Sequence, residues 1–334
     1  MRNFVMSTFA ILLLAGCSNE IKESDYKFAG DMGAKVTFSA VINNQNASNL
    51  GRATATSWDA GDIIGITCGS KQVNVSYRYK ANEGNYFEAV DGTREIWLMG
   101  TEQYDVSAYY PYTGTDGAAP APLAVETTTA NQATAADRQK LDFLYASGVA
   151  NRENSNVQLD FNHVMSRIVL TFQGDGIVLK DIDCYISGLK LTGTFNTATG
   201  KTMVNEDAEV ESVNQVLTDD NNHTMTAIFL PQKVSGKEIL IEAGMSGIYY
   251  KVQLPVTDFP ELKAGYSYNY TITAKNYSNE PIRLVITATQ INPWTDVNGG
   301  TLTPDPGLAG TDAGITSPGW GDIINETVTP TEKK

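Results

Sequence analysis

Apolar and polar side chains alternate along the segment 35–42, where every second residue is apolar. A period of two is the period of a β-strand with one buried face. The next ten residues are rich in Asn, Gln and Ser and end at Arg52, which predicts an exposed loop. A second apolar run follows at 63–66. The apolar positions of the first predicted strand are Val36, Phe38, Ala40 and Ile42.

Short apolar or alternating segments recur along most of the remaining chain, separated by Gly, Asn and Asp. Asp91-Gly92 is one such turn signal, of the kind that closes a hairpin. In the second half these segments recur at a spacing of roughly ten residues, which is typical of an all-β sandwich. The predicted strands are 73–80, 86–90, 95–99, 104–110, 142–149, 157–161, 177–186, 189–195, 225–230, 238–243, 248–254, 266–274 and 282–291.

The chain is long enough for two domains, and Gln173-Gly174-Asp175-Gly176 is the best candidate boundary. We therefore expect one β-sandwich over residues 34–173 and another over 174–296. Residues 113–136 lack a clear period and predict a long surface loop, with one short helix starting near Gln132. Residues 297–334 are rich in Gly, Pro, Thr and Asp and are either a flexible tail or a strand that awaits a partner.

The first sixteen residues predict a removable signal rather than folded structure. Met1-Arg2-Asn3 is followed by a short apolar core and then by Leu14-Ala15-Gly16-Cys17. That spacing matches a bacterial lipobox, in which Cys17 becomes the acylated first residue and anchors the chain in a membrane. The alternative is an ordinary secretory signal with an incidental Cys. Residues 17–33 are polar and of mixed charge, which predicts a tether.

Composition excludes some functions. Of the 334 residues, 42% are hydrophobic and 19% charged, a globular balance, and the net charge is −14. A phosphate backbone would be repelled by that charge, so we expect no nucleic acid partner. After the signal no apolar run is long enough for a membrane helix. Cys68 and Cys184 either pair or lie buried as small apolar residues.

Catalytic and metal-binding patterns are not found in the sequence, so we expect no enzyme, cofactor or metal. His163 lies in an apolar segment and predicts a structural histidine, whereas His223 lies in a polar turn and predicts a solvated one. The segment 198–202 (Ala-Thr-Gly-Lys-Thr) lacks the first glycine of a phosphate loop. Asp219-Asp220-Asn221-Asn222 lacks the spacing of a calcium loop.

Exposed tyrosines are candidates for stacking on sugars, although alternating tyrosines more often pack across strands. The candidates are Tyr77, Tyr79, Tyr109, Tyr110, Tyr112, Tyr249 and Tyr250.

A series of short motifs resembles the fimbrillin-like (Mfa/fimbrillin-type) lipoprotein pilins of Gram-negative anaerobes. The resemblance covers about residues 34–296, and the order of the motifs carries it more than any one of them. The motifs are Arg52-Ala53-Thr54-Ala55-Thr56, Trp58-Asp59-Ala60-Gly61-Asp62-Ile63-Ile64-Gly65-Ile66, Tyr109-Tyr110-Pro111, the segment Phe161-Asn162-His163 through Leu170, Gly193-Thr194-Phe195-Asn196, Phe229-Leu230-Pro231-Gln232, Lys263-Ala264-Gly265-Tyr266 and Asn292-Pro293-Trp294.

The resemblance implies two tandem transthyretin-like β-sandwich domains in a lipoprotein exported to the outer membrane. It also implies that an Arg-specific protease cuts after Arg52 and that pilin subunits then assemble into a pilus by strand exchange. The removable strand would carry Val36, Phe38, Ala40 and Ile42. A host protein or a glycan remains open as receptor. The alternative is a monomeric surface lipoprotein that binds glycan or protein and never polymerises.

Overall fold

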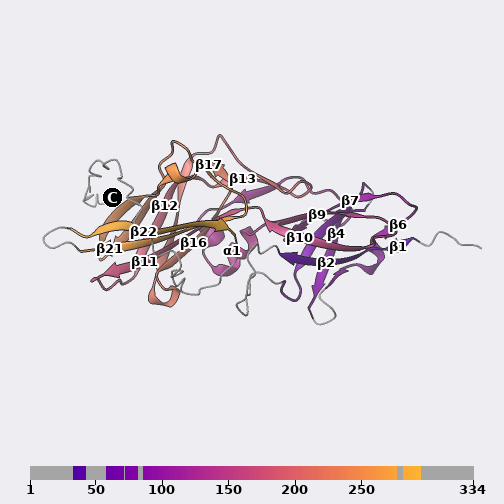
Figure 1. Cartoon of the computed structure of the whole chain (residues 1–334), viewed down its shortest axis with the longest axis horizontal. Helices are drawn as coiled ribbons and strands as arrows, with labels where there is room; N and C mark the ends of the chain where they lie inside the picture. The colour runs from indigo at the N-terminus through magenta and orange to yellow at the C-terminus, as the bar shows by residue number, and fades with distance from the viewer. Residues whose placement is uncertain (1–32, 43–57, 71, 82–85, 277–280, 295–334) are drawn as a thin grey trace, which may run out of the picture.

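The computed structural model of the chain describes residues 33–42, 58–70, 72–81, 86–276 and 281–294. Within these residues the protein is an all-β fold with one short α-helix. No helix in the described ranges combines the length and the apolar character needed to cross a membrane. The barrel described next and a two-sheet body lie end to end along the long axis of the molecule (Figure 1).

Seven strands of the N-terminal part form a closed barrel in the order β10, β2, β5, β4, β3, β7, β9. Neighbouring strands run antiparallel, except that β2 runs parallel to β10. A core of apolar and aromatic side chains fills the barrel. The strands are β2 (Thr37–Ile42), β3 (Ile63–Cys68), β4 (Gln72–Lys80), β5 (Tyr86–Ala89), β7 (Tyr104–Tyr110), β9 (Leu144–Ala150) and β10 (Asn156–His163).

A small two-stranded sheet lies at the outer end of the barrel (Figure 1). It pairs β1 (Ala34–Lys35) with β6 (Trp97–Leu98), and the 3₁₀ turn η1 (Gly92–Arg94) precedes β6. The start of the described chain is therefore held at two places. β1 pairs with β6, and β2 pairs with its neighbours in the barrel.

The C-terminal part packs two four-stranded sheets face to face around a second core. One sheet has the order β16, β11, β21, β22 and the other β15, β12, β18, β19. Apolar residues on alternating positions of β11 and β12 face each other in this core, as the period-two pattern predicts. The strands are β11 (Ser166–Asp175), β12 (Ile182–Lys190), β15 (Val210–Leu217), β16 (Thr224–Phe229), β18 (Leu240–Met245), β19 (Ile248–Gln253), β21 (Tyr266–Lys275) and β22 (Arg283–Pro293).

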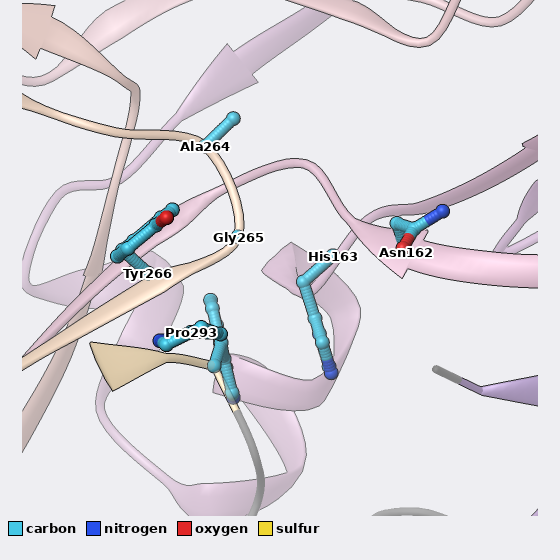
Figure 2. Close-up of a pocket in the computed structure, with 7 residues that line it drawn as sticks. Asn162, His163, Ala264, Gly265, Tyr266 and Pro293 are labelled. Atoms are coloured by element: carbon cyan, nitrogen blue, oxygen red, sulfur yellow. The ribbon is translucent and has the colours of Figure 1, made fainter. Parts of the chain in front are cut away.

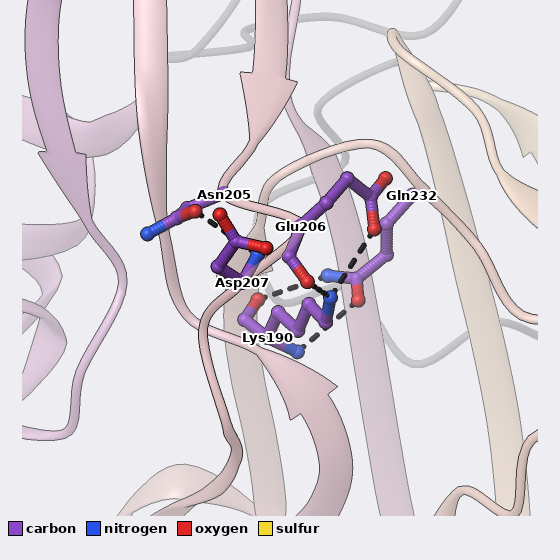
Figure 3. Close-up of polar contacts among 5 residues, drawn as sticks. All are labelled: Lys190, Asn205, Glu206, Asp207 and Gln232. Carbon is purple, nitrogen blue, oxygen red and sulfur yellow. Dashed lines mark hydrogen bonds and ion pairs between the residues drawn. The ribbon is translucent and has the colours of Figure 1, made fainter.

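Short elements connect the sheets of this body. The 3₁₀ turn η3 (Asp219–Asn221) leads into β16, and η4 (Val256–Asp258) follows β19. β17 (Gln232–Lys233) pairs with β20 (Glu261–Leu262). The Gln232 side chain acts here like a piece of backbone, since its amide accepts from Lys190 N at 3.1 Å and donates to Lys190 O at 3.0 Å (Figure 3). The Lys190 ammonium reaches back to Glu206, whose carboxylate lies 3.2 Å away.

A segment of the N-terminal part crosses onto the C-terminal sheets and joins the two bodies. It contains β8 (Leu123–Glu126), η2 (Ala130–Gln132) and α1 (Ala135–Leu141). β8 extends the hairpin of β13 (Thr192–Asn196) and β14 (Lys201–Val204) into a three-stranded sheet. A third cluster of buried side chains lies at this junction and includes Tyr109, Phe143, Phe195 and Trp294.

Two sequence-based expectations are wrong here. The expected boundary at 173/174 falls inside β11, which pairs with β16 and β21 of the C-terminal body. The chain passes from the barrel to the C-terminal body between His163, where β10 ends, and Ser166, where β11 begins. This stretch contains no Gly or Pro, so the composition of the sequence did not indicate a boundary there. Residues 113–122 form a loop, as predicted. Residues 123–136 are not a plain surface loop, because β8 is paired and Gln132 of η2 is buried. The short helix α1 ends at Leu141, as the sequence predicts.

Candidate functional site

The strand β2 lies between β10 and β5 in the barrel, with its alternating apolar face turned inward. Val36 is 1% exposed, Phe38 0% and Ala40 9%, whereas Ile42 at the end of the strand is half-buried. β2 matches β10 over six residue pairs, from Thr37↔Asn156 to Ile42↔Phe161, but matches β5 over only two. Most of its strand pairing is therefore made with β10.

Aromatic rings surround the buried face of β2. The Phe38 ring meets Tyr77 edge-on, with centroids 5.1 Å apart. Trp58 donates its indole N–H to Ala40 O at 3.1 Å and packs edge-on against Phe161. Burial raises the pKa of Tyr77, whose phenol oxygen accepts from Ile96 N at 3.0 Å. If β2 were absent, these groups would line an apolar groove with one row of unpaired β10 backbone groups.

Three of the sequence-based predictions concern residues outside the described ranges. They are the lipidated residue Cys17, the cleavage residue Arg52 and the tail 297–334.

His163 contacts residues that are distant in sequence. Its Nδ1 lies 2.6 Å from an Asp142 carboxylate oxygen, and its ring stacks on Trp294 with centroids 4.5 Å apart and planes within 4°. The Arg167 guanidinium covers the same indole, 4.7 Å from its centroid. A shallow pocket of about 200 Å³ opens beside this stack, between Asn162, Gly265 and Pro293 (Figure 2). The stack ties the end of β22 to the junction of the two bodies.

Sequence reasoning did not find the His163 partners, because Asp142 follows α1 and Trp294 follows β22, and both are distant from His163 in the chain. In the described part of the chain, no three His, Cys, Asp or Glu side chains gather as a metal site would require. His223 is not a freely solvated side chain as predicted, since its Nε2 lies 3.1 Å from Lys180 O.

Most of the candidate tyrosines do not present free ring faces. Tyr77 and Tyr109 are each 3% exposed, which excludes them as sugar-stacking candidates and agrees with the packing role that alternation favours. Tyr79, Tyr110, Tyr112 and Tyr250 are half-buried, and Tyr249 on β19 is 43% exposed. Alternation alone could not separate these cases, because a closed barrel buries one face of every strand.

The two cysteines of the folded part are free thiols. Cys68 lies in the core of the barrel and Cys184 in the core of the two-sheet body. Of the two readings left open by the sequence, burial as small apolar side chains is therefore confirmed.

The geometry defines an elongated all-β protein in which β2, near the start of the described chain, completes a barrel. The chain belongs to the fimbrillin-like family, whose match spans residues 51–294. This confirms the resemblance inferred from the motifs.

Individual relatives agree with this assignment. The chain is 23% identical to "Putative fimbrium subunit Fim1C" of Bacteroides uniformis over 315 residues, covering 90% of this chain and 97% of the relative. Its structure is similar to a "putative cell adhesion protein" of Bacteroides ovatus, with a TM-score of 0.68 and 26% identity over 80% of this chain and 99% of the other. A second "putative cell adhesion protein", from Bacteroides uniformis, shares the fold with a TM-score of 0.59 and 21% identity, covering 78% and 98%.

Proposed function

We propose that the protein is a fimbrium subunit of the cell surface that joins other pilin subunits by exchange of its first strand. Family membership supports the first part, since the relatives are described as a fimbrium subunit and as cell adhesion proteins. The observation that carries the second part is β2, the first strand of the barrel in chain order, which has an apolar inner face and completes the closed barrel.

Position in the chain makes β2 replaceable. A strand at the beginning of the described fold can leave without drawing another strand through the barrel. Within the barrel, β2 and β10 form the parallel pair, which is slightly less stable per residue than an antiparallel one.

The emptied groove would be strongly driven to refill. Each buried apolar side chain of β2 contributes about 1.5–3 kcal/mol when it is fully removed from water. A strand of similar pattern from a neighbouring subunit would recover this energy and satisfy the backbone of β10. Cleavage after Arg52 by an Arg-specific protease would release β2 from the rest of the chain and start this exchange.

The remaining parts of the proposal rest on the sequence. Cys17 would carry the lipid that anchors the precursor in the outer membrane, and residues 297–334 would supply the donor strand. The barrel and the two-sheet body would correspond to the two transthyretin-like domains of the resemblance. A host protein or glycan would be the receptor.

The experiment treats the purified chain with an Arg-specific protease and sequences the new N-terminus. We expect cleavage before Ala53, and we expect Arg52→Lys to resist while Arg152→Lys, in another turn, is cut normally. The cut protein should take up a labelled peptide of residues 34–42 and form heat-labile oligomers on electrophoresis without boiling. A cut protein that stays monomeric and takes up no peptide would identify the monomeric surface lipoprotein instead.

A further inference from the structure

The outer face of the sheet β15-β12-β18-β19 carries aromatic rings among polar groups. Strand register places outward residues side by side across all four strands. One row runs Val216, Asp183, Gly244, Tyr249, and the next runs Asn214, Tyr185, Glu242, Lys251. Alternate residues on the same strands, such as Cys184 and Ile241, face the core.

Two tyrosines of this face share one carboxylate. Tyr185 donates its hydroxyl to Asp183 Oδ2 at 2.8 Å, and Tyr249 donates to the same oxygen at 3.1 Å. The two ring centroids lie 6.2 Å apart with planes inclined by 54°. Because both hydroxyls are fixed, the rings lose little further rotamer freedom when a ligand covers them.

Gly244 lets the Tyr249 ring lie close to the sheet. A Cβ at this position would come within 2.8 Å of the ring, so a larger residue would push the ring away. The ring covers the glycine with one side and is still 43% exposed. Packing over a strand glycine explains why one side of the ring lies against the sheet, and the exposed fraction leaves ring surface that a ligand can cover.

Polar groups flank the rings and set the charge of the face. Glu242 forms an ion pair with Lys251 at 2.5 Å, and Asp183 keeps an acceptor oxygen beside the two phenols. Carboxylates beside aromatic rings accept hydrogen bonds from hydroxyl groups and repel anions. The apolar ring faces suit the C–H face of a pyranose, and the acceptors suit its hydroxyls.

We propose that Tyr185, Tyr249 and Asp183 form a binding platform for neutral oligosaccharides. The rings stack on the sugar, and Asp183 and Glu242 accept from its hydroxyls. Sialylated and uronate sugars are disfavoured by the same carboxylates. The platform lies on the C-terminal body and does not depend on β2 or on Arg52, so its failure would leave the proposed assembly untouched.

The experiment titrates the full uncut chain with gluco-, manno- and galacto-configured pentasaccharides, and with sialylated and uronate oligosaccharides as anionic probes. We expect at least one neutral pentasaccharide to bind with millimolar or better affinity, and the anionic probes to bind about tenfold more weakly or not at all. Tyr249→Ala and Tyr185→Ala should each weaken binding about tenfold or more. Trp97→Ala removes a ring that is 44% exposed at the far end of the molecule, and it should bind normally.

Two further variants separate the rings from their hydroxyls. Tyr249→Phe keeps the ring and should retain most of the oligosaccharide binding. Gly244→Ala keeps both tyrosines, but its Cβ tilts the Tyr249 ring, so oligosaccharide binding should weaken. Thermal unfolding of each variant confirms that the body remains folded. The proposal is overturned if no neutral pentasaccharide binds, if Tyr249→Ala binds like the natural chain, or if the anionic probes bind equally well.

Discussion

At the scale of single residues, burial decides what the two free thiols can do. Burial raises the pKa of Cys68 to about 11 and also raises that of Cys184. The thiolate is the reactive form of cysteine, so both side chains stay protonated and unreactive at neutral pH. Their role is to fill two separate cores, which agrees with their position on inward faces of β3 and β12.

Alkylation kinetics test this assignment. At pH 8 a free cysteine of pKa about 8.5 is about one quarter thiolate, whereas at pKa about 11 the fraction is about one thousandth. In a chain with Cys17→Ser, we expect iodoacetamide to label Cys68 at least about a hundredfold more slowly than an exposed control thiol made by Ser70→Cys. The rate should rise as pH approaches 11. Equal rates for the two thiols at pH 8 would show that Cys68 is accessible.

At the scale of elements, β2 shows how much a local pattern can predict. The period of two placed Phe38 and Ala40 of β2 on the buried face, together with Val36 just before the strand, because side chains alternate in every strand. The partner strands were not predictable, since β10 lies more than a hundred residues away in the chain. Which strands pair with each other depends on register and topology, and a local sequence pattern specifies neither of them.

The same limit explains the errors at other elements. Tyr109 lies on the same face of β7 as the polar residues Asp105 and Ser107, yet the junction core buries it. No turn residue stands between β10 and β11, so the local sequence did not predict that β11 pairs with β16 and β21 of the C-terminal body. The contact between Tyr185 and Tyr249 was not predictable either, because only the register of β12, β18 and β19 brings Tyr249 beside Asp183 and Tyr185.

Truncation of Phe38 tests the contribution of β2 to the barrel. Phe38→Ala removes a ring that is 0% exposed and packs on Tyr77, which should destabilise the barrel by about 3–5 kcal/mol. Ser39→Ala, on the exposed face of the same strand, should change stability by less than about 0.5 kcal/mol. Denaturant unfolding measures both values. Amide exchange should rise first in β10 and β5, and a rise confined to the C-terminal sheets would contradict this account.

At the scale of the whole molecule, residues 127–132 bond to backbone groups on two sheet edges of the C-terminal body, and we call this segment the seal. The Thr129 hydroxyl accepts from Asn214 N at 3.0 Å on the edge strand β15. The Gln132 amide accepts from Ile228 N at 2.8 Å and donates to Ile228 O at 3.2 Å on the edge strand β16. Two side chains from the N-terminal part thus satisfy backbone groups on two adjacent sheet edges of the C-terminal body. An edge whose backbone groups are satisfied offers no template for another strand.

Removal of the Gln132 amide should loosen this seal. Gln132 is 4% exposed, and Gln132→Ala leaves the N–H and C=O of Ile228 without their partner, at a cost of about 1–3 kcal/mol each. We expect a lower melting temperature and faster amide exchange at Ile228, whereas Gln139→Ala on the exposed side of α1 should change neither. Because an opened β16 edge can pair with another chain, the Gln132 variant should also self-associate, without protease, in a sedimentation experiment. If it stayed monomeric with natural exchange at Ile228, the contact would be a packing detail rather than a seal, and the pairing of β8 with β13 and the junction core would hold the two bodies together without it.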